Sequence, residues 1–189
     1  MTVKPSKTGV VVAHGGRSPG SHLFRDEVAA LSKRGHLVLA TAVHMPLGAD
    51  DEEELRRFDA AVEVQRRAVD ELEARGATRI GFYGHSLGAA RGLALAARDP
   101  RVIAVVVAAM GTGMRPLPWD PIRYVTVQGP ARVFQQGTRD EIVPLDAARR
   151  LYDAAPEPKR WLEYDWDHGI DACPQARLDR YAFLDETLG

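Results

Sequence analysis

The segment Gly84-His85-Ser86-Leu87-Gly88 places a serine between two glycines, with an apolar run before it and a run of small residues after it. Glycine two positions before and after a serine suits a strand that turns abruptly into a helix, because neither position leaves room for a Cβ atom. Such a turn lifts the serine hydroxyl clear of the backbone. The spacing predicts that Ser86 is a nucleophile, with a small residue at a tight turn as the alternative.

A serine nucleophile needs two partners. An alkoxyl group is a weak nucleophile at its ordinary pKa, so a histidine must accept its proton and a carboxylate must orient that histidine. We assign these roles to His168 in the segment DWDHG (165–169) and to Asp140 in the segment QGTRDEIVP (136–144). The alternatives to Asp140 are the nearby acids Glu141, Asp165, Asp167 and Asp171.

The negative oxygen of an acyl intermediate needs two preorganised N–H donors. By position, one donor is the backbone N–H of Leu87, directly after the serine. The second is the backbone N–H of Gly16 in the glycine-rich segment AHGGRSPG (13–20), with the neighbouring Arg17 as the alternative. These groups together predict an oxyanion hole made of backbone.

Short apolar runs alternate with helical patterns along the chain. The predicted strands cover 9–16, 36–43, 79–84, 101–109, 131–137 and 160–165, and the predicted helices cover 22–34, 52–75, 87–98, 145–154 and 175–188. Strands that are apolar without alternation, and mostly followed by helices, indicate a parallel sheet covered on both faces. We therefore expect an α/β fold of three layers, α/β/α, with a mostly parallel sheet of about six strands in a single domain, 1–189. The segments that bear the chemistry all follow strands, so they should meet at the carboxyl edge of this sheet.

In these motifs the chain resembles the α/β-hydrolase superfamily, from Gly9 to about Leu188. The resemblance rests on GHSLG (84–88), HGG (14–16), GTRD (137–140) with VP (143–144), and HG (168–169), in the order Ser, Asp, His. It is most similar to the compact dienelactone-hydrolase-like and small serine carboxylesterase branch, although dienelactone hydrolases proper use cysteine as nucleophile.

The resemblance implies a triad of Ser86, Asp140 and His168, and a minimal core without the antiparallel hairpin of larger relatives. It also identifies the crossover from Gly111 to Pro130 as the place where relatives insert a cap domain. A parallel crossover itself needs a dozen or more residues, so about twenty residues cannot also build a cap. We expect an open site.

Apolar side chains cluster in segments that flank the motifs. We predict that an acyl pocket is walled by Met45, Met114, Trp119 and Trp166, with ordinary core packing as the alternative for each. Arg17 and Arg91 are further candidates for binding a carboxylate of the substrate, but for both we favour a position on the solvated surface.

The other histidines are not expected to catalyse. His14 should brace the glycine loop by hydrogen bonding, and His85 should point away from the base. No pair of the six histidines has the spacing of a helical metal-ligand motif, and the single cysteine, Cys173, excludes sites built on paired cysteines. We therefore expect no metal and no cofactor.

The composition is that of an ordinary globular protein, with 45% hydrophobic and 27% charged residues. A net charge of −1 gives no electrostatic case for nucleic acid or an anionic membrane as a partner. The N-terminal residues lack the apolar region of a signal peptide, and the longest apolar run, Val102–Met110, is far shorter than a membrane span. We expect a cytoplasmic protein.

The predicted function is a serine hydrolase that cleaves a small carboxylic ester or thioester through an acyl-enzyme. Its predicted partner is a small-molecule acyl substrate. One alternative is an acyltransferase or lactone-opening enzyme with the same triad, and another is a non-catalytic ligand-binding homologue. Motifs fix a reaction class, whereas pocket shape selects the substrate, so neither the substrate nor the oligomeric state follows from these residues.

Overall fold

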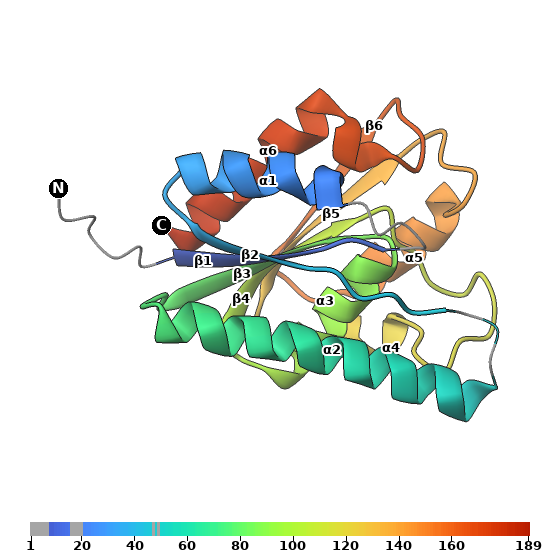
Figure 1. The fold of residues 1–189 in the computed structure, drawn as a ribbon. Helices are drawn as coiled ribbons and strands as arrows, with labels where there is room; N and C mark the ends of the chain where they lie inside the picture. Colours follow the sequence, from blue (N-terminus) through green and yellow to red (C-terminus); the bar gives the residue numbers. More distant parts are fainter. Residues whose placement is uncertain (1–7, 16–20, 47, 49) are drawn as a thin grey trace, which may run out of the picture.

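The computed structural model describes residues 8–15, 21–46, 48 and 50–189 (Figure 1). The strands are β1 (Thr8–Ala13), β2 (Leu37–Thr41), β3 (Arg79–His85), β4 (Val102–Ala108), β5 (Ala131–Gly137) and β6 (Lys159–Tyr164). The helices are α1 (Ser21–Lys33), α2 (Asp51–Ala74), α3 (Leu87–Arg98), α4 (Ile122–Val125), α5 (Leu145–Ala154) and α6 (Pro174–Leu188), with the 3₁₀ helix η1 (Ile170–Ala172).

All six strands are parallel and form one sheet in the order β2-β1-β3-β4-β5-β6. The order reverses direction between β1 and β3, and ligands of open α/β sheets bind outside the carboxyl ends of the strands at such a point. The prediction of a parallel α/β fold with about six strands is confirmed.

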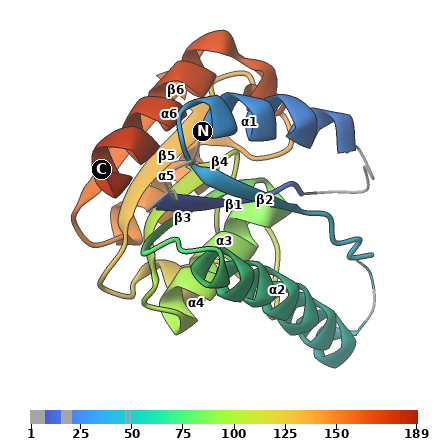
Figure 2. The ribbon, with the colours of Figure 1, turned by 60° about the vertical axis from the view of Figure 1, so that its left-hand side comes forward.

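Helices cover both faces of the sheet, which makes three layers (Figures 1 and 2). Strand residues contribute alternately to the two cores: Val11 and Val107 pack with α2, α3 and α5, whereas Val10 and Val106 pack with α1 and α6. Burial on both faces explains why these strands are uniformly apolar.

The long helix α2 illustrates how local sequence sets the boundaries. The side chain of Asp50 accepts a hydrogen bond from the backbone N–H of Glu53 at 2.9 Å, which caps the first turn. Gly76 follows the helix with a φ of 97°, a left-handed conformation that glycine adopts without strain. The predicted range, 52–75, matches this helix to within one residue.

Two short helices, α4 and η1, were not predicted from the sequence. Helix α4 has only four residues and follows Pro121 in a segment rich in glycine and proline, and η1 has three residues. Elements this short carry too few residues for a periodic pattern. The crossover from β4 to β5, all of which the structure describes, contains α4 as its only regular element, so it holds no inserted cap.

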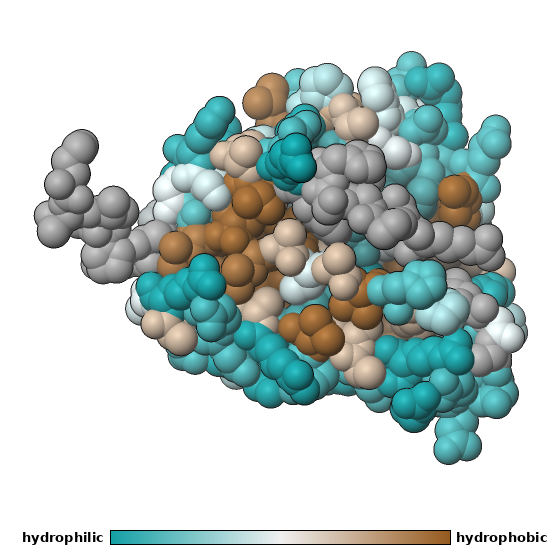
Figure 3. Space-filling view, in the orientation of Figure 1, coloured by the Kyte–Doolittle hydropathy of each residue, from teal (hydrophilic) through white to brown (hydrophobic). Residues whose placement is uncertain are grey.

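Hydrophobic side chains gather between α1 and α2, over the edge strand β2 (Figure 3). Leu37, Val38 and Leu39 of this strand are half-buried. Within the described part of the chain, no helix combines the length and the apolar character that crossing a membrane requires.

Candidate active site

Ser86 lies at a sharp turn between β3 and α3. Its φ of 53° and ψ of −125° are strained for a residue with a side chain. A Cβ atom on Gly84 would lie 2.5 Å from the carbonyl oxygen of Gly88, and one on Gly88 would overlap the carbonyl oxygen of Ala13. Both glycines of the motif are therefore required by close backbone approach.

The loop after β1 passes directly beside the first residue of α3. A Cβ atom on Gly15 would lie only 2.5 Å from the backbone nitrogen of Leu87. As the first residue of a helix, Leu87 has an N–H without an intrahelical acceptor, so this donor is available to a ligand. Gly16 and Arg17, the predicted second donor and its alternative, lie outside the described residues.

Asp140 and His168 are in direct contact. The Nδ1 atom of His168 lies 2.9 Å from Oδ2 of Asp140, whose side chain is fully buried, whereas the His168 side chain is 20% exposed. Among the candidate acids, Asp165 instead pairs with Arg139 at the surface, and Asp167 accepts a hydrogen bond from the backbone N–H of Gly169. Asp140 thus contacts the His168 ring, whereas Asp165 and Asp167 have other partners.

The buried Asp140 carboxylate is held by several donors. Its Oδ1 atom accepts hydrogen bonds from the backbone N–H groups of Ile142 and Val143, and its Oδ2 atom also accepts one from Nε2 of Gln136 at 3.0 Å. Burial raises the pKa of Asp140, but the hydrogen bonds from His168 and the backbone outweigh it and hold the pKa below its usual value. Asp140 is therefore a carboxylate at neutral pH, and Gln136 is an orienting residue that sequence reasoning missed.

A glycine brings the loops of Asp140 and His168 together. A Cβ atom on Gly137 would lie 2.5 Å from the backbone oxygens of Trp166 and Asp167. The backbone N–H of Arg139 donates to the Trp166 carbonyl at 2.9 Å, which ties the two loops to each other. The glycine of the GTRD motif is explained by this close approach.

Ser86 and His168 lie at the same edge of the sheet, but no hydrogen bond joins the Ser86 hydroxyl to the His168 ring, both of which the structure describes. The rings of His85 and His168 are 5.0 Å apart between centroids. Catalytic hydrogen bonds are often long before substrate binds. The structure therefore joins Asp140 to His168 directly and places Ser86 nearby.

The prediction that His85 points away from the base is wrong. Its Nε2 atom donates a hydrogen bond to the backbone oxygen of His168 at 2.7 Å, and its side chain is only 5% exposed. Asp171 lies next to the same ring, with Oδ1 3.8 Å from Nε2 of His85. No local pattern could reveal this contact, because it joins residues more than eighty positions apart.

His14 contacts the glycine loop as predicted. Its Nδ1 atom lies 2.6 Å from the carbonyl oxygen of Gly15, and its ring centroid is 4.7 Å from that of His85. Its Nε2 atom faces Asp171, with 3.9 Å to Oδ2. The interaction with the nearby Asp171 carboxylate is the main influence that raises the pKa of His14 above its usual value.

Arg91 is buried, so the expectation of a solvated surface residue is wrong. Its guanidinium donates to the carbonyl oxygens of Leu87 at 3.3 Å, Val43 at 3.3 Å and His14 at 2.6 Å. Burial lowers its pKa to about 10, so the group remains charged at neutral pH. Arg91 thereby links α3 to the loops after β1 and β2.

A pocket of about 240 Å³ opens at Ser86 and Leu87. Met114 and Trp119 line it, in the positions predicted for an acyl pocket, and Met110, Leu117, Ile142 and Val143 add further apolar surface. Met45 is instead buried in the core, and Trp166 packs on the other face of the sheet, where its Nε1 donates to the carbonyl of Gly169. Neither of these two predicted residues lines the pocket.

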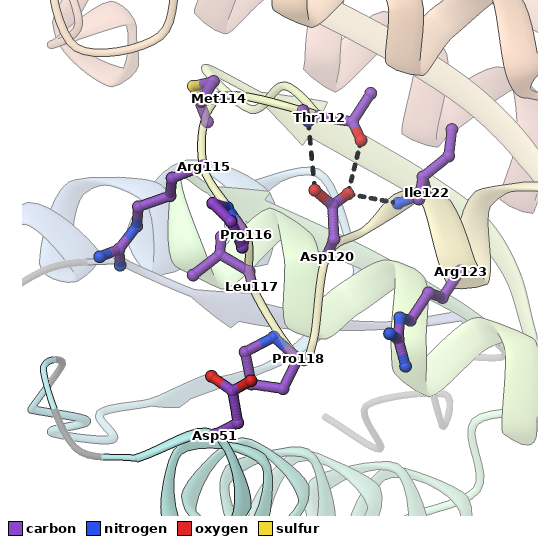
Figure 4. Close-up of a pocket in the computed structure, with 11 residues that line it drawn as sticks. Asp51, Thr112, Met114, Arg115, Pro116, Leu117, Pro118, Asp120, Ile122 and Arg123 are labelled. Carbon is purple, nitrogen blue, oxygen red and sulfur yellow. Dashed lines mark hydrogen bonds between the residues drawn. The ribbon is translucent and has the colours of Figure 1, made fainter.

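The pocket adjoins a wider groove of about 750 Å³ along the β4–β5 crossover (Figure 4). Met114, Arg115 and Leu117 line both hollows. Asp120 holds the crossover in shape, because its carboxylate accepts hydrogen bonds from the Thr112 hydroxyl and from the backbone of Gly113 and Ile122.

His85→Gln should weaken the dependence of stability on pH. Burial is the main cause that lowers the pKa of His85 to about 4, whereas an unfolded histidine titrates near 6.5. Between these values the unfolded chain binds a proton that the folded chain does not. The wild-type free energy of unfolding should therefore fall by up to about 3 kcal/mol as the pH drops from about 6.5 to 4, and the variant should lose less.

Urea unfolding of both proteins at pH 7 and pH 4.5, with a chelator present, measures this difference. His14 affects the free energy of unfolding in a different pH range. Because its pKa is raised in the folded protein, its contribution to stability is fully present below about pH 6.5 and is lost at higher pH. Because acids common to both proteins cancel in the comparison, equal losses in the two proteins would show that His85 does not titrate as described.

Comparison with known sequences shows which family the chain matches. The chain matches the sequence profile of the alpha/beta hydrolase family over residues 10–187. It is 33% identical over 100 residues to an uncharacterised protein of Mycobacterium tuberculosis (strain ATCC 25618 / H37Rv), an alignment that covers 44% of this chain. The matched region spans 35% of the length of that relative.

Solved structures share the fold over nearly the whole chain. The esterase domain of a Rhodothermus marinus protein has a TM-score of 0.75 at 22% identity, covering 100% of this chain and 90% of its own. The Pyrococcus furiosus esterase Pf2001 has a TM-score of 0.77 at 19% identity, covering 97% and 83%. TT1662 from Thermus thermophilus has a TM-score of 0.74 at 23% identity, covering 97% and 90%. These TM-scores establish a common fold, and at identities below 25% they establish the fold alone.

Proposed function

The chain belongs to the alpha/beta hydrolase family, and from this premise we propose that it is a serine hydrolase that cleaves a small carboxylic ester or thioester through an acyl-enzyme. The observation that carries the proposal is the buried Asp140 carboxylate hydrogen-bonded to His168, at the same sheet edge as the strained Ser86 turn and its pocket. The esterases among the structural neighbours support the same reaction class.

In this mechanism the Ser86 hydroxyl attacks the carbonyl carbon of the substrate while Nε2 of His168 accepts its proton. The Asp140 carboxylate keeps the proton of the neutral ring on Nδ1, which leaves Nε2 free as the base, and stabilises the imidazolium that forms. His168 then donates the proton to the leaving group. Water repeats the sequence on the acyl-enzyme and releases the acid.

The tetrahedral intermediate carries its charge on the former carbonyl oxygen. The N–H of Leu87 at the start of α3 supplies one donor, with the helix dipole favouring a negative charge at this end. The loop after β1 supplies the second, from Gly16 or Arg17. Arg91 supports this loop by donating to the carbonyl of His14.

Labelling with a fluorophosphonate tests the nucleophile directly. We expect one adduct per chain on Ser86, found by peptide mass spectrometry, and no adduct in Ser86→Ala. This result would also separate an enzyme from a non-catalytic ligand-binding homologue. Competition between water and added alcohols or amines for the acyl-enzyme then separates hydrolysis from acyl transfer.

Short acyl chains should be the best substrates. A pocket of about 240 Å³ is smaller than the roughly 300–1,000 Å³ typical of drug-sized ligands, and the groove beside it is wide. Each methylene that is fully buried contributes about 0.8 kcal/mol, roughly fourfold in kcat/KM, and the pocket can bury only the first few carbons. We expect kcat/KM for p-nitrophenyl esters to peak at about two to six acyl carbons.

The measurement is a series of p-nitrophenyl esters from acetate to laurate below their aggregation concentrations. Met114→Ala, which removes apolar surface from the pocket wall, should reduce the gain per carbon, whereas Val64→Ala on the exposed face of α2 should not. A steady rise in kcat/KM up to twelve carbons would contradict the short pocket.

A further inference from the structure

Three side chains beside the candidate triad converge on one point. His14 follows β1, His85 precedes Ser86, and Asp171 lies three residues after His168. The ligating atoms of these residues all lie within 4.8 Å of one another. The separations of 3.8 Å and 3.9 Å between the Asp171 oxygens and the two Nε2 atoms are too long for direct hydrogen bonds, so the three groups surround a shared space.

From this convergence we propose that His14, His85 and Asp171 form a binding site for a divalent transition-metal ion. Two imidazoles and a carboxylate are ligands that Zn²⁺ and related ions prefer. Zinc lies about 2.0–2.2 Å from such atoms, so ligand atoms around a tetrahedral ion are roughly 3.3 Å apart. Each pair of ligand atoms therefore needs to approach by no more than about 1.5 Å.

The protonation states of His85 and Asp171 suit a cation. Burial lowers the pKa of His85 to about 4, which leaves its ring neutral. Burial raises the pKa of Asp171, but His14 and His85 outweigh it and hold that pKa at about 2, so the group is a carboxylate. The hydrogen bond between Nδ1 of His14 and the Gly15 carbonyl turns Nε2 toward Asp171, as second-shell hydrogen bonds do for metal-binding histidines.

Binding requires one rearrangement at His85. Its Nε2 atom now donates to the His168 carbonyl, so the proton of the neutral ring must move to Nδ1, a buried atom without a partner among the described residues. The ring keeps one proton throughout. The His168 carbonyl oxygen, 2.7 Å from Nε2 of His85, is then free to become a fourth ligand.

An ion at this place would join the three loops that hold the proposed oxyanion donor, the nucleophile and the base. It has a route of entry, because the side chains of His14 and Asp171 are 17% and 13% exposed. The three ligands come from positions 14, 85 and 171, which explains why no local spacing indicated a metal site.

Metal titration tests the proposal. The full chain is purified without a histidine tag, treated with a chelator, and titrated with Zn²⁺ in a calorimeter and with Co²⁺ by visible absorption. We expect one ion per chain and a rise in Tm on addition of Zn²⁺. Asp171→Asn and His14→Gln should each weaken binding at least about tenfold. His44→Gln, which changes an exposed histidine outside the cluster, should bind as the wild type does.

Absence of binding at millimolar Zn²⁺, or equal binding by the wild type, Asp171→Asn and His14→Gln, would overturn the proposal. Circular dichroism checks that each variant is folded. If Asp171→Asn does not fold, His14→Gln decides the question, because His14 is the more exposed of the two residues. Binding is measured without substrate, so the result is independent of the proposed ester hydrolysis.

Discussion

Replacing Ser86 with alanine should lower kcat/KM for a p-nitrophenyl ester by about 10⁴- to 10⁶-fold. The variant keeps the pocket and the Asp140–His168 pair but has no oxygen to form the acyl-enzyme. His168→Ala should cost a similar factor, because the Ser86 hydroxyl then has no base. The double variant should be little worse than either single one, since residues that act as a unit are not additive.

Steady-state kinetics on purified proteins measures these factors, and thermal unfolding shows whether the fold survives. Alanine at position 86 occupies the same strained turn, so its Tm should stay within a few degrees of the wild-type value. Ser32→Ala, on the exposed face of α1, is the matched control and should retain wild-type kinetics. Substantial activity in Ser86→Ala would show that Ser86 is not the nucleophile.

Asp140→Asn should lower kcat by about 10³- to 10⁴-fold with little change in KM. The amide oxygen can replace Oδ1, which accepts from the backbone N–H groups of Ile142 and Val143. The amide nitrogen then takes the place of Oδ2 and donates to Nδ1 of His168. The imidazole is forced to carry its proton on Nε2, where it cannot accept the proton of the serine.

Asp140→Asn also places the new amide nitrogen opposite Nε2 of Gln136, so that two donors face each other. A loss of stability of about 1 kcal/mol should therefore accompany the loss of rate. Asp165→Asn is the matched control, because that acid is 86% exposed and pairs with Arg139 at the surface. It should change kcat less than about twofold. If Asp140→Asn kept a tenth or more of the wild-type kcat, another acid would have to orient the base.

Much of the fold follows from local sequence. The six strands and the five longer helices were predicted to within three residues at each end, because apolar runs, helical periodicity and stop signals such as Gly76 act over a few residues. The turn at Ser86 was also predicted, because Gly84 and Gly88 are demanded by steric contacts within one strand-turn-helix unit.

The pairing of the candidate residues depended on the tertiary structure. Five acids were candidates to orient the base, and only the loop contacts made possible by Gly137 show that Asp140 touches His168. Trp119 and Trp166 were equivalent as pocket walls until the sheet placed the first beside Ser86 and the second on its other face.

The sequence by itself determined the parallel α/β architecture, the sharp turn at Ser86 and the set of residues able to form a triad. These features arise from steric and periodic constraints between near neighbours. The tertiary structure alone decided the burial of Arg91, the contact of His85 with the base and the meeting of His14 with Asp171. Each of these joins separate strands or loops, and their mutual placement depends on the order and register of the sheet, which no local pattern encodes.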